Sequence, residues 1–401
     1  MSTQDYKTKS EIIERRLPRI NGNNQYKSKT IVALDGGYSS VKGVSPNKVF
    51  KFPSYAKKAP ETLEAMTKVD PADILFRNDN TGEVWVVGRT AEILMEQRDI
   101  DSMTDASLYT RYRYDSDIFK VIMIAGVALG LLATGKTDEV FLQTGLPATY
   151  KERDEEKIKK ALAGSYRVSI KVGNNPWAAL AFDLPESNIG VMEQPQGTLC
   201  SCIYSNGELS PEGKKILQSK GTIILDIGFG TEDIFSTKGG FKNNHQTYSD
   251  TGMRAVFESV TKTLHDQKDI DVKVFELQSS LSSGIISYTD PYTFETEDIE
   301  YGSILEAANQ ELCQKSIQRL MQEYGNLQGY EYLIVTGGTG ESRFEQIQQK
   351  LGNIRTNGVP LKILPGNLNM PELSCSYSNV MGYYMYRHVQ FTAEMKKLGA
   401  L

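Results

Sequence analysis

The first feature that could do chemistry is a loop that combines an aspartate with adjacent glycines. It spans residues 35–42, reads DGGYSSVK, and follows the apolar run 31–34. Glycines at such a turn let the backbone approach a phosphate closely, and successive N–H groups can surround an anion. Ser39 and Ser40 add hydroxyl donors, and Lys42 supplies a positive charge for a polyphosphate. Asp35 would repel phosphate, so we expect it to act through a hydrated Mg²⁺ lying between the two.

A second loop repeats this order of residue types. Residues 226–233 read DIGFGTED and follow the apolar run 221–225. Asp226 takes the place of the first aspartate, and Thr231 again offers a hydroxyl donor. Either loop alone could be an ordinary glycine-rich hairpin. The two aspartates are 191 residues apart (226 − 35), which indicates a repeat at the scale of a domain.

A third glycine-rich turn lies later in the chain. Residues 335–342 read VTGGTGES, between a predicted strand at 332–335 and a predicted helix at 343–351. Glycines at the start of a helix allow close approach of a flat or phosphorylated ligand. The sequence contains neither the GxxxxGK[ST] loop nor the Rossmann GxGxxG pattern, which argues against both of the common nucleotide-binding folds.

The elements that must position these loops alternate between strands and helices, which predicts an α/β protein. We expect strands at 31–34, 41–44, 48–52, 84–88, 139–143, 167–173, 179–183, 221–225, 232–237 and 332–335. We expect helices at 118–134, 151–163, 252–265, 302–324, 343–351 and 378–401. Residues 1–29 are polar and are interpreted as a mobile or loosely docked extension, with a short helix possible near 10–17.

Bulk properties narrow the function classes. A chain of 401 residues exceeds the usual size of one core, so two domains are expected, with the two aspartate loops facing a shared cleft. The net charge of −5 gives no overall basic character, so we expect no direct binding of duplex DNA. The apolar run 121–133 is too short to span a bilayer, and no signal peptide is visible, so we expect a cytoplasmic protein. The cysteines and histidines show no metal-ligand spacing.

The order of the two aspartate loops and the Gly-Gly turn is similar to that in the superfamily of actin, heat-shock chaperones and sugar kinases. Lys42 resembles the actin branch. The segments 189–197 (IGVMEQPQG), 248–253 (YSDTGM) and 378–383 (SNVMGY) resemble the bacterial plasmid-segregation actins of the ParM and Alp type. The resemblance runs from about residue 30 to residue 390. It implies an actin-like ATPase fold, with two ribonuclease-H-like domains around a nucleotide cleft.

The resemblance also implies a division of the chain and roles for its residues. Domain I would comprise residues 30–184 and 376–401, and domain II residues 185–375. The aspartates Asp35 and Asp226 would hold Mg²⁺ through water. Groups of both loops would hold the phosphates: Gly36, Gly37, Ser39, Ser40 and Lys42 from one side, and Gly228, Gly230 and Thr231 from the other. The adenosine would lie against Gly337, Gly338 and Thr339.

The expected catalytic groups are Gln194, Glu193 and Asp226. Gln194 is the candidate for orienting the attacking water, because a neutral amide can both donate to it and accept from it. Glu193 is the competing candidate, and a surface amide before a proline is the alternative interpretation of Gln194. Glu232 and Asp233 have no assigned role at this point.

The function implied by the resemblance is a polymerising ATPase. It would bind ATP or GTP with Mg²⁺, assemble into filaments, hydrolyse after assembly and move plasmid DNA through a DNA-binding adaptor protein. Its partners would be further copies of itself and the adaptor, with no direct nucleic-acid or membrane contact. The alternatives are a sugar kinase of the same superfamily, which needs an aspartate base in the cleft, and a chaperone-like or reactivating ATPase.

Overall fold

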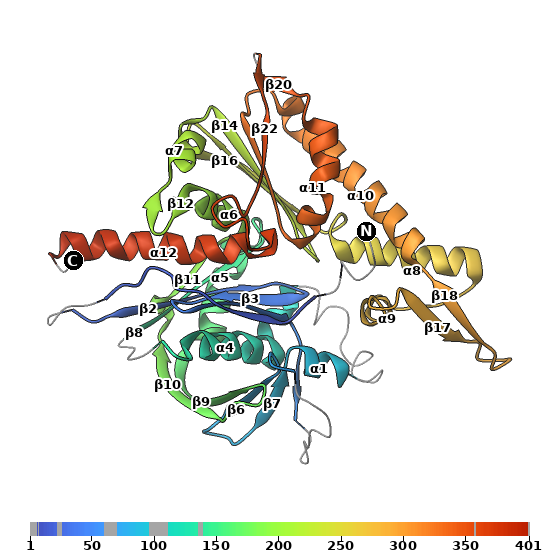
Figure 1. Cartoon of the computed structure of the whole chain (residues 1–401), viewed down its shortest axis with the longest axis horizontal. Helices are drawn as coiled ribbons and strands as arrows, with labels where there is room; N and C mark the ends of the chain where they lie inside the picture. The colour runs from blue at the N-terminus through green and yellow to red at the C-terminus, as the bar shows by residue number, and fades with distance from the viewer. Residues whose placement is uncertain are drawn as a thin grey trace.

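The computed structural model describes residues 6, 8–21, 26–59, 70–95, 111–134, 139–356 and 358–399. The chain forms two α/β bodies, one above the other in Figure 1, with the helix α12 (Ser378–Lys397) lying between them. Both N-terminal and C-terminal segments contribute to the lower body. The α/β class expected from the alternation of elements is confirmed.

The lower body is built on a six-stranded sheet with the order β1-β4-β3-β2-β8-β11. Its strands are β1 (Glu11–Glu14), β2 (Lys29–Gly36), β3 (Ser40–Val44), β4 (Lys48–Pro53), β8 (Glu139–Leu146) and β11 (Ile189–Glu193). Strands β8 and β11 run parallel to β2, and the others form an antiparallel meander. The sheet therefore continues past residue 184, the expected end of domain I.

Both faces of this sheet are covered. Val32 and Leu34 pack on one side with the helix α4 (Asp117–Leu131), and Ile31 and Ala33 pack on the other side with α12. Successive side chains of a strand point to opposite faces, so a strand buried on both sides is apolar throughout. This explains why the run 31–34 has no polar residue. No helix in the described part of the chain is long and apolar enough to cross a bilayer.

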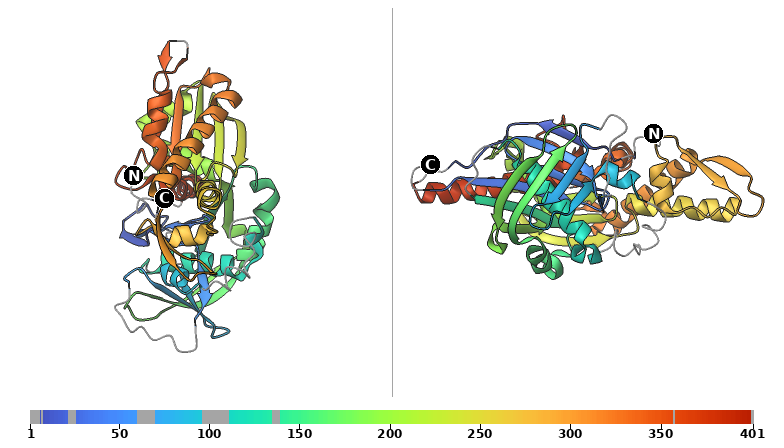
Figure 2. Two further views of the ribbon diagram at one scale, coloured as in Figure 1. Left: turned by 90° about the vertical axis from the view of Figure 1, so that its right-hand side faces the viewer. Right: turned by 90° about the horizontal axis from the view of Figure 1, so that it is seen from below.

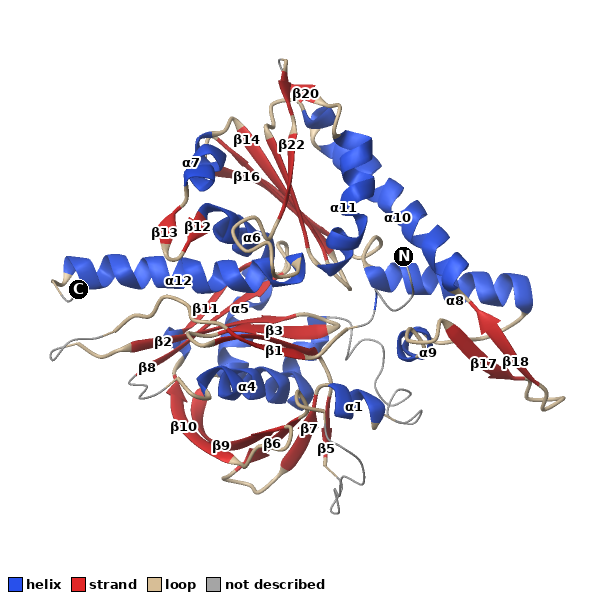
Figure 3. Ribbon diagram, in the orientation of Figure 1, coloured by secondary structure: helices blue, strands red, loops and turns tan. Residues whose placement is uncertain are grey.

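A second, antiparallel sheet closes the far side of α4 (Figure 3). Its order is β10-β9-β6-β7-β5. The strands are β5 (Ala56–Lys58), β6 (Ile74–Asn78), β7 (Val84–Val87), β9 (Gly164–Val172) and β10 (Ala178–Leu184). The helix α1 (Arg89–Ile93) follows β7 in the sequence, and α5 (Lys151–Leu162) precedes β9. Its inner side chains share one hydrophobic core with α4 and the first sheet.

The upper body is built on a five-stranded sheet with the order β16-β15-β14-β19-β22. These strands are β14 (Gly221–Ile227), β15 (Glu232–Lys238), β16 (Phe241–Tyr248), β19 (Tyr332–Thr336) and β22 (Lys362–Pro365). The core on one face includes residues of α10 (Gly302–Glu323) and α11 (Gly338–Leu351). The core on the other face includes residues of α6 (Gln194–Ile203) and α7 (Pro211–Gln218).

A smaller lobe projects from this body, as the right-hand view of Figure 2 shows. It contains α8 (Met253–Lys268), α9 (Val274–Ser279) and the hairpin of β17 (Ile285–Thr289) and β18 (Thr296–Glu300), with a core of its own. The short hairpins β12 (Tyr204–Ser205) with β13 (Glu208–Leu209), and β20 (Arg355–Thr356) with β21 (Val359–Pro360), lie elsewhere on the upper body.

The two main sheets repeat one topology. In each, three antiparallel strands in chain order are followed by two strands parallel to the first: β2-β3-β4 with β8 and β11, and β14-β15-β16 with β19 and β22. Asp35 lies near the end of β2 and Asp226 near the end of β14. The repeat inferred from the spacing of the two aspartates is therefore a repeat of the fold.

The helices α6 and α12 cross at the junction of the two bodies. A Cβ added at Gly382 would lie 1.6 Å from the carbonyl oxygen of Gly197, and one at Gly197 would lie 2.4 Å from the ring of Tyr383. Only residues without a side chain let the two backbones approach this closely. Glycine inside a helix usually weakens it, and here the close crossing is what requires it.

The N-terminal segment differs from its prediction. The expected short helix near residues 10–17 is wrong, because residues 11–14 form strand β1, paired antiparallel with β4. Ile12 and Ile13 pack against the cores on opposite faces of the sheet, which suits a strand and not a helix. Leu17 and Ile20 are buried, and the Tyr384 hydroxyl donates a 2.6 Å hydrogen bond to the Pro18 carbonyl. The described part of the extension is therefore docked on the first sheet.

Candidate functional site

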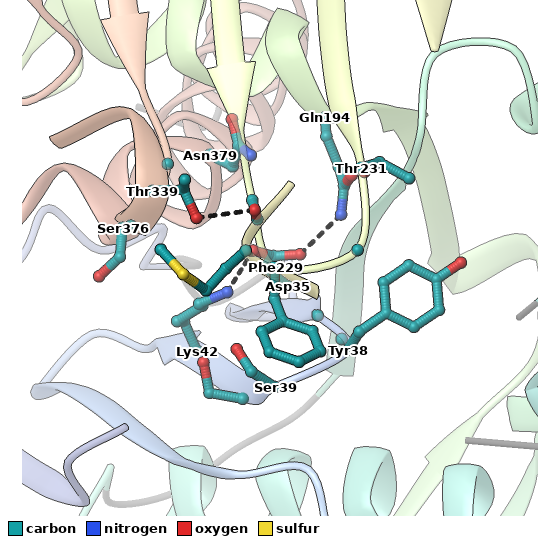
Figure 4. Close-up of a pocket in the computed structure, with 18 of the residues that line it drawn as sticks. Asp35, Tyr38, Ser39, Lys42, Gln194, Phe229, Thr231, Thr339, Ser376 and Asn379 are labelled. Carbon is teal, nitrogen blue, oxygen red and sulfur yellow. Dashed lines mark hydrogen bonds and ion pairs between the residues drawn. The ribbon is translucent and has the colours of Figure 1, made fainter. Parts of the chain in front are cut away.

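One cleft between the two bodies brings together the three loops singled out in the sequence (Figure 4). Loop 1 (residues 35–42) lies at the end of β2, loop 2 (residues 226–233) at the end of β14, and the Gly-Gly turn (residues 335–342) at the end of β19. The carboxyl ends of the central strands of both sheets thus face the same space, which is where open α/β sheets bind ligands. All of the predicted phosphate-binding and adenosine-binding residues line this cleft.

Loop 1 places charged groups on the floor of the cleft. Asp35 and Lys42 are partners in the β2–β3 register, and the Lys42 Nζ lies 3.3 Å from the Asp35 Oδ2. The carbonyl of Gly37 accepts hydrogen bonds from the Ser54 hydroxyl at 2.7 Å and from the Arg113 guanidinium at 3.0 Å. A Cβ at Gly37 would lie 2.8 Å from the Ser40 carbonyl oxygen. The turn is thus held tightly and admits only glycine at that position.

Loop 2 carries a fully buried carboxylate. The Asn379 Nδ2 donates a 2.6 Å hydrogen bond to the Asp226 Oδ2. Burial, with the neighbouring charge of Asp233, raises the pKa of Asp226 from 3.8 to about 7. The clustering of acidic groups that raises this pKa would be relieved by a bound cation. A Cβ at Gly230 would lie 2.5 Å from the ring of Tyr38, so loop 2 rests directly on loop 1.

The Gly-Gly turn rests on loop 2 in the same way. Gly337 has a φ of +82°, and a Cβ there would lie 2.3 Å from the Ile227 carbonyl oxygen and 2.6 Å from the Asp226 Oδ1. The Thr339 hydroxyl donates a 2.8 Å hydrogen bond to the Gly228 carbonyl. The helix α11 begins at Gly338, earlier than the predicted start at residue 343. The turn therefore points a helix N-terminus toward the cleft, where backbone N–H groups suit an anion.

The adjacent candidates Glu193 and Gln194 lie in different surroundings. Gln194 lines the cleft, and its Nε2 donates a 2.9 Å hydrogen bond to the Asp35 Oδ1. Glu193 is buried outside the cleft lining, and its Oε1 accepts from Lys242 at 2.5 Å and lies 3.2 Å from the His245 Nδ1. Lys242 and His245 belong to β16, so Glu193 joins the two bodies. The structure brings only Gln194 to the loops.

The two acidic residues after loop 2 also separate. The Asp233 carboxylate accepts hydrogen bonds from the Ala148 N–H at 2.8 Å and from the hydroxyls of Thr231 and Thr247 at 2.9 and 2.5 Å. Burial raises the pKa of Asp233 from 3.8 to about 6. Ala148 follows β8 of the lower body, so Asp233 ties the two bodies together. Glu232 points to the other face of β15, where its Oε1 lies 3.6 Å from Arg319.

Several lining residues were missed at the level of sequence. Asn379 opens α12 and holds Asp226, and Tyr38, Phe229 and Ser376 line the cleft (Figure 4). Asn379 lies in the segment 378–383 that resembles the plasmid-segregation actins, so a polar residue at the start of that predicted helix was a usable signal. Tyr38 and Phe229 lie within the two aspartate loops themselves, and Ser376 carries no distinctive spacing.

The donor set fits Mg²⁺ held through water. Asp35 and Asp226 both line the cleft, and Mg²⁺ in nucleotide sites is usually bound through one or two carboxylates, waters and substrate phosphates. Among the described residues, no three His, Cys, Asp or Glu side chains form a group that could coordinate a metal ion. The phosphates would therefore have to supply part of its coordination.

Comparison with known proteins agrees with this geometry. Residues 33–197 match the family described as actin-like proteins, N-terminal domain. Comparison with curated proteins gave no match. Among solved structures, a non-polymerisable quadruple mutant of pCBH ParM is 18% identical, with 91% of this chain and 99% of that chain covered and a TM-score of 0.67.

Two further solved structures extend the comparison. A 15-stranded ParM filament from Clostridium botulinum is 18% identical, with 90% of this chain and 99% of that chain covered and a TM-score of 0.63. The archaeal actin homologue Ta0583 in complex with ADP is 14% identical, with 89% and 99% covered and a TM-score of 0.60. At these identities the likeness is one of fold. Residues 33–197 thus match the N-terminal domain of actin-like proteins, and the chain as a whole has the two-domain actin-like fold.

Proposed function

We propose that this protein is an actin-like ATPase that binds ATP with Mg²⁺ in the cleft and polymerises into dynamic filaments. It hydrolyses ATP after assembly, and the filaments move plasmid DNA in the cytoplasm through a DNA-binding adaptor. The observation that carries the proposal is the hydrogen bond from Gln194 to Asp35. It sets a neutral amide from α6 beside a loop 1 carboxylate, in a cleft that Asp226 also lines.

The two loops hold the triphosphate from opposite sides in this proposal. Lys42 and the hydroxyls of Ser39 and Ser40 act from loop 1, and the Thr231 hydroxyl and the backbone near Gly228 act from loop 2. The Gly-Gly turn and the start of α11 face the nucleoside. Asp35 and Asp226 hold Mg²⁺ through water, and the ion supplies charge neutralisation at the phosphates.

Gln194 orients the attacking water in this proposal. Its amide can donate to the water and accept from it, and its bond to Asp35 restrains the side chain before the nucleotide arrives. Glu193 acts instead as a bridge between the bodies, because its carboxylate is engaged by Lys242 and His245. GTP is the alternative nucleotide for the same cleft.

A pair of adjacent variants tests the hydrolytic role. Gln194→Ala should slow phosphate release by about 10²-fold or more, the usual scale for loss of a group that positions a reactant. Glu193→Gln keeps the side-chain shape and should leave the rate within a few-fold of the native protein. Equal rates for Gln194→Ala and the native protein would remove Gln194 from the mechanism. The readout is phosphate release at saturating ATP–Mg²⁺.

Polymerisation is tested separately by light scattering and pelleting. Adding ATP–Mg²⁺ should raise the scattering above a critical protein concentration, and the signal should fall as ATP is consumed. The protein without nucleotide is the control. A flat trace at high protein concentration would reject the filament proposal, and ADP release that requires a sugar would favour a kinase instead.

A further inference from the structure

The segment before β1 crosses from one body to the other. Within the lower body, β1 pairs with β4, and the Glu11 carboxylate is held by Lys51 at 3.1 Å and by the Tyr377 hydroxyl at 2.6 Å. Five residues earlier, Tyr6 contacts α10 of the upper body. Residue 7 lies outside the described residues. The described N-terminal residues therefore contact both bodies, Tyr6 the upper one and Glu11 the lower one.

The socket of Tyr6 combines the half-buried Glu306 with the buried Asn309 and Arg343. Its hydroxyl donates to the Glu306 Oε2 at 3.3 Å and accepts from the Asn309 Nδ2 at 3.2 Å. Asn309 is itself held by the buried Arg343 of α11, whose Nε donates to the Asn309 Oδ1 at 2.8 Å. Burial and the charge of Glu306 raise the pKa of Tyr6 to about 12, so the hydroxyl remains protonated. The ring packs against the core of the small lobe.

Tyr6 also lines the cleft that holds the three loops. Through Asn309 and Arg343, the hydroxyl of Tyr6 is linked to α11, the helix that begins at the Gly-Gly turn. Met253 and Leu281 line the cleft and belong to the lobe core against which Tyr6 packs. If loops 1 and 2 hold the phosphates, the base of the nucleotide lies toward this apolar end.

We propose that Tyr6 is a nucleotide-binding residue whose ring contacts the purine base. The proposal rests on the ATP binding proposed above. A purine has flat faces that stack on aromatic rings, and the partly buried ring of Tyr6 is held in place at its hydroxyl by two side chains of α10. Tyr6 belongs to the segment that the sequence predicts to be a mobile or loosely docked extension.

The test compares two ligands that share the phosphates but differ in the base. Isothermal titration of the full chain with ATP–Mg²⁺ should show about tenfold weaker binding for Tyr6→Ala, the scale of one aromatic–base contact. Binding of inorganic tripolyphosphate with Mg²⁺ should be unchanged, because it has no base. Tyr6→Phe keeps the ring and should bind ATP within about threefold of the native protein. Thermal unfolding of each variant checks that the fold is retained.

The matched control is Tyr292→Ala, which removes an exposed tyrosine from the loop between β17 and β18. It should change neither affinity. Unchanged or tighter ATP binding by Tyr6→Ala would overturn the inference, and tighter binding would mean that Tyr6 occupies the place of the base. An equal loss of both ligands would overturn it as well, since that pattern reports damage to the phosphate loops. A native chain that binds neither ligand would reject the proposed ATP binding itself.

Discussion

Replacing Asp226 by asparagine should stabilise the ligand-free protein while it removes a group that the nucleotide site needs. Asp226 is buried near two other carboxylates, Asp233 and Asp35, whose charges both raise its pKa. Asparagine keeps the shape and an oxygen that can accept the hydrogen bond from Asn379. The substitution therefore removes a buried negative charge and preserves the packing.

The magnitude follows from the pKa of Asp226. It is raised from 3.8 in the unfolded chain to about 7 in the fold, and a tenfold change in proton affinity corresponds to about 1.4 kcal/mol. Below pH 4 the carboxyl is protonated in both states, and its contribution does not vary with pH. Between pH 4 and 7 the unfolded chain ionises first, so the stability of the native protein falls as pH rises. Asparagine cannot titrate, and the advantage of the variant should grow by about 2–3 kcal/mol from pH 5 to pH 8.

The assay is equilibrium unfolding in denaturant, followed by circular dichroism at pH 5, 6, 7 and 8 with EDTA and without nucleotide. Asp183→Asn, which changes an exposed carboxylate on β10, is the control and should show no such trend. Adding ATP–Mg²⁺ should stabilise the native protein by mass action and the Asp226→Asn variant far less. A difference that stays constant or shrinks with rising pH would refute the argument from buried charge.

Two packing predictions follow from glycines at close approaches. Gly337→Ala should destabilise the fold by about 2 kcal/mol, because its positive φ and its contact with the Ile227 carbonyl both exclude a side chain. A Cβ at Gly338 would meet only the Cβ of Ser376 at 4.0 Å, so Gly338→Ala should keep the stability within about 0.5 kcal/mol in the same denaturation assay. Gly382→Ala should lower the stability by about 2 kcal/mol or more, because α12 must move away from α6 to make room for the methyl group. The control Lys396→Ala, which changes an exposed residue of α12, should leave the stability unchanged. Equal denaturation midpoints for these two variants would contradict the close crossing.

Local signals were enough to predict the main strands and the loops that end them. The runs 31–34, 221–225 and 332–335 are apolar and stop at glycine-rich turns, and each forms a buried strand of a main sheet. These signals act over a few residues, so they can be read without knowing the fold. The repeated order of residue types also indicated a repeated domain, and the matching strand orders of the two main sheets agree with it.

Elements that depend on partners far away in the sequence were predicted less well. Residues 11–14 become a strand because β4, more than 30 residues away, offers an open edge. The helix α6 was not predicted, because its segment contains a proline and a glycine. Pro195 lies in the first turn, where a helix tolerates proline, and Gly197 lies where α12 crosses α6. The N-terminal segment was predicted to be a mobile or loosely docked extension, because no local signal reveals that Tyr6 has a socket on α10.

The sequence by itself determined which residue types end the strands, and therefore where phosphate could be held. It could not decide between Glu193 and Gln194, because the two residues are adjacent and both polar. That choice depends on contacts made far along the chain: Gln194 meets Asp35 from 159 residues away, while Glu193 is drawn to Lys242 and His245 on β16. Adjacent residues at the end of a strand project in different directions, so only the placement of the two sheets decides which one faces the cleft.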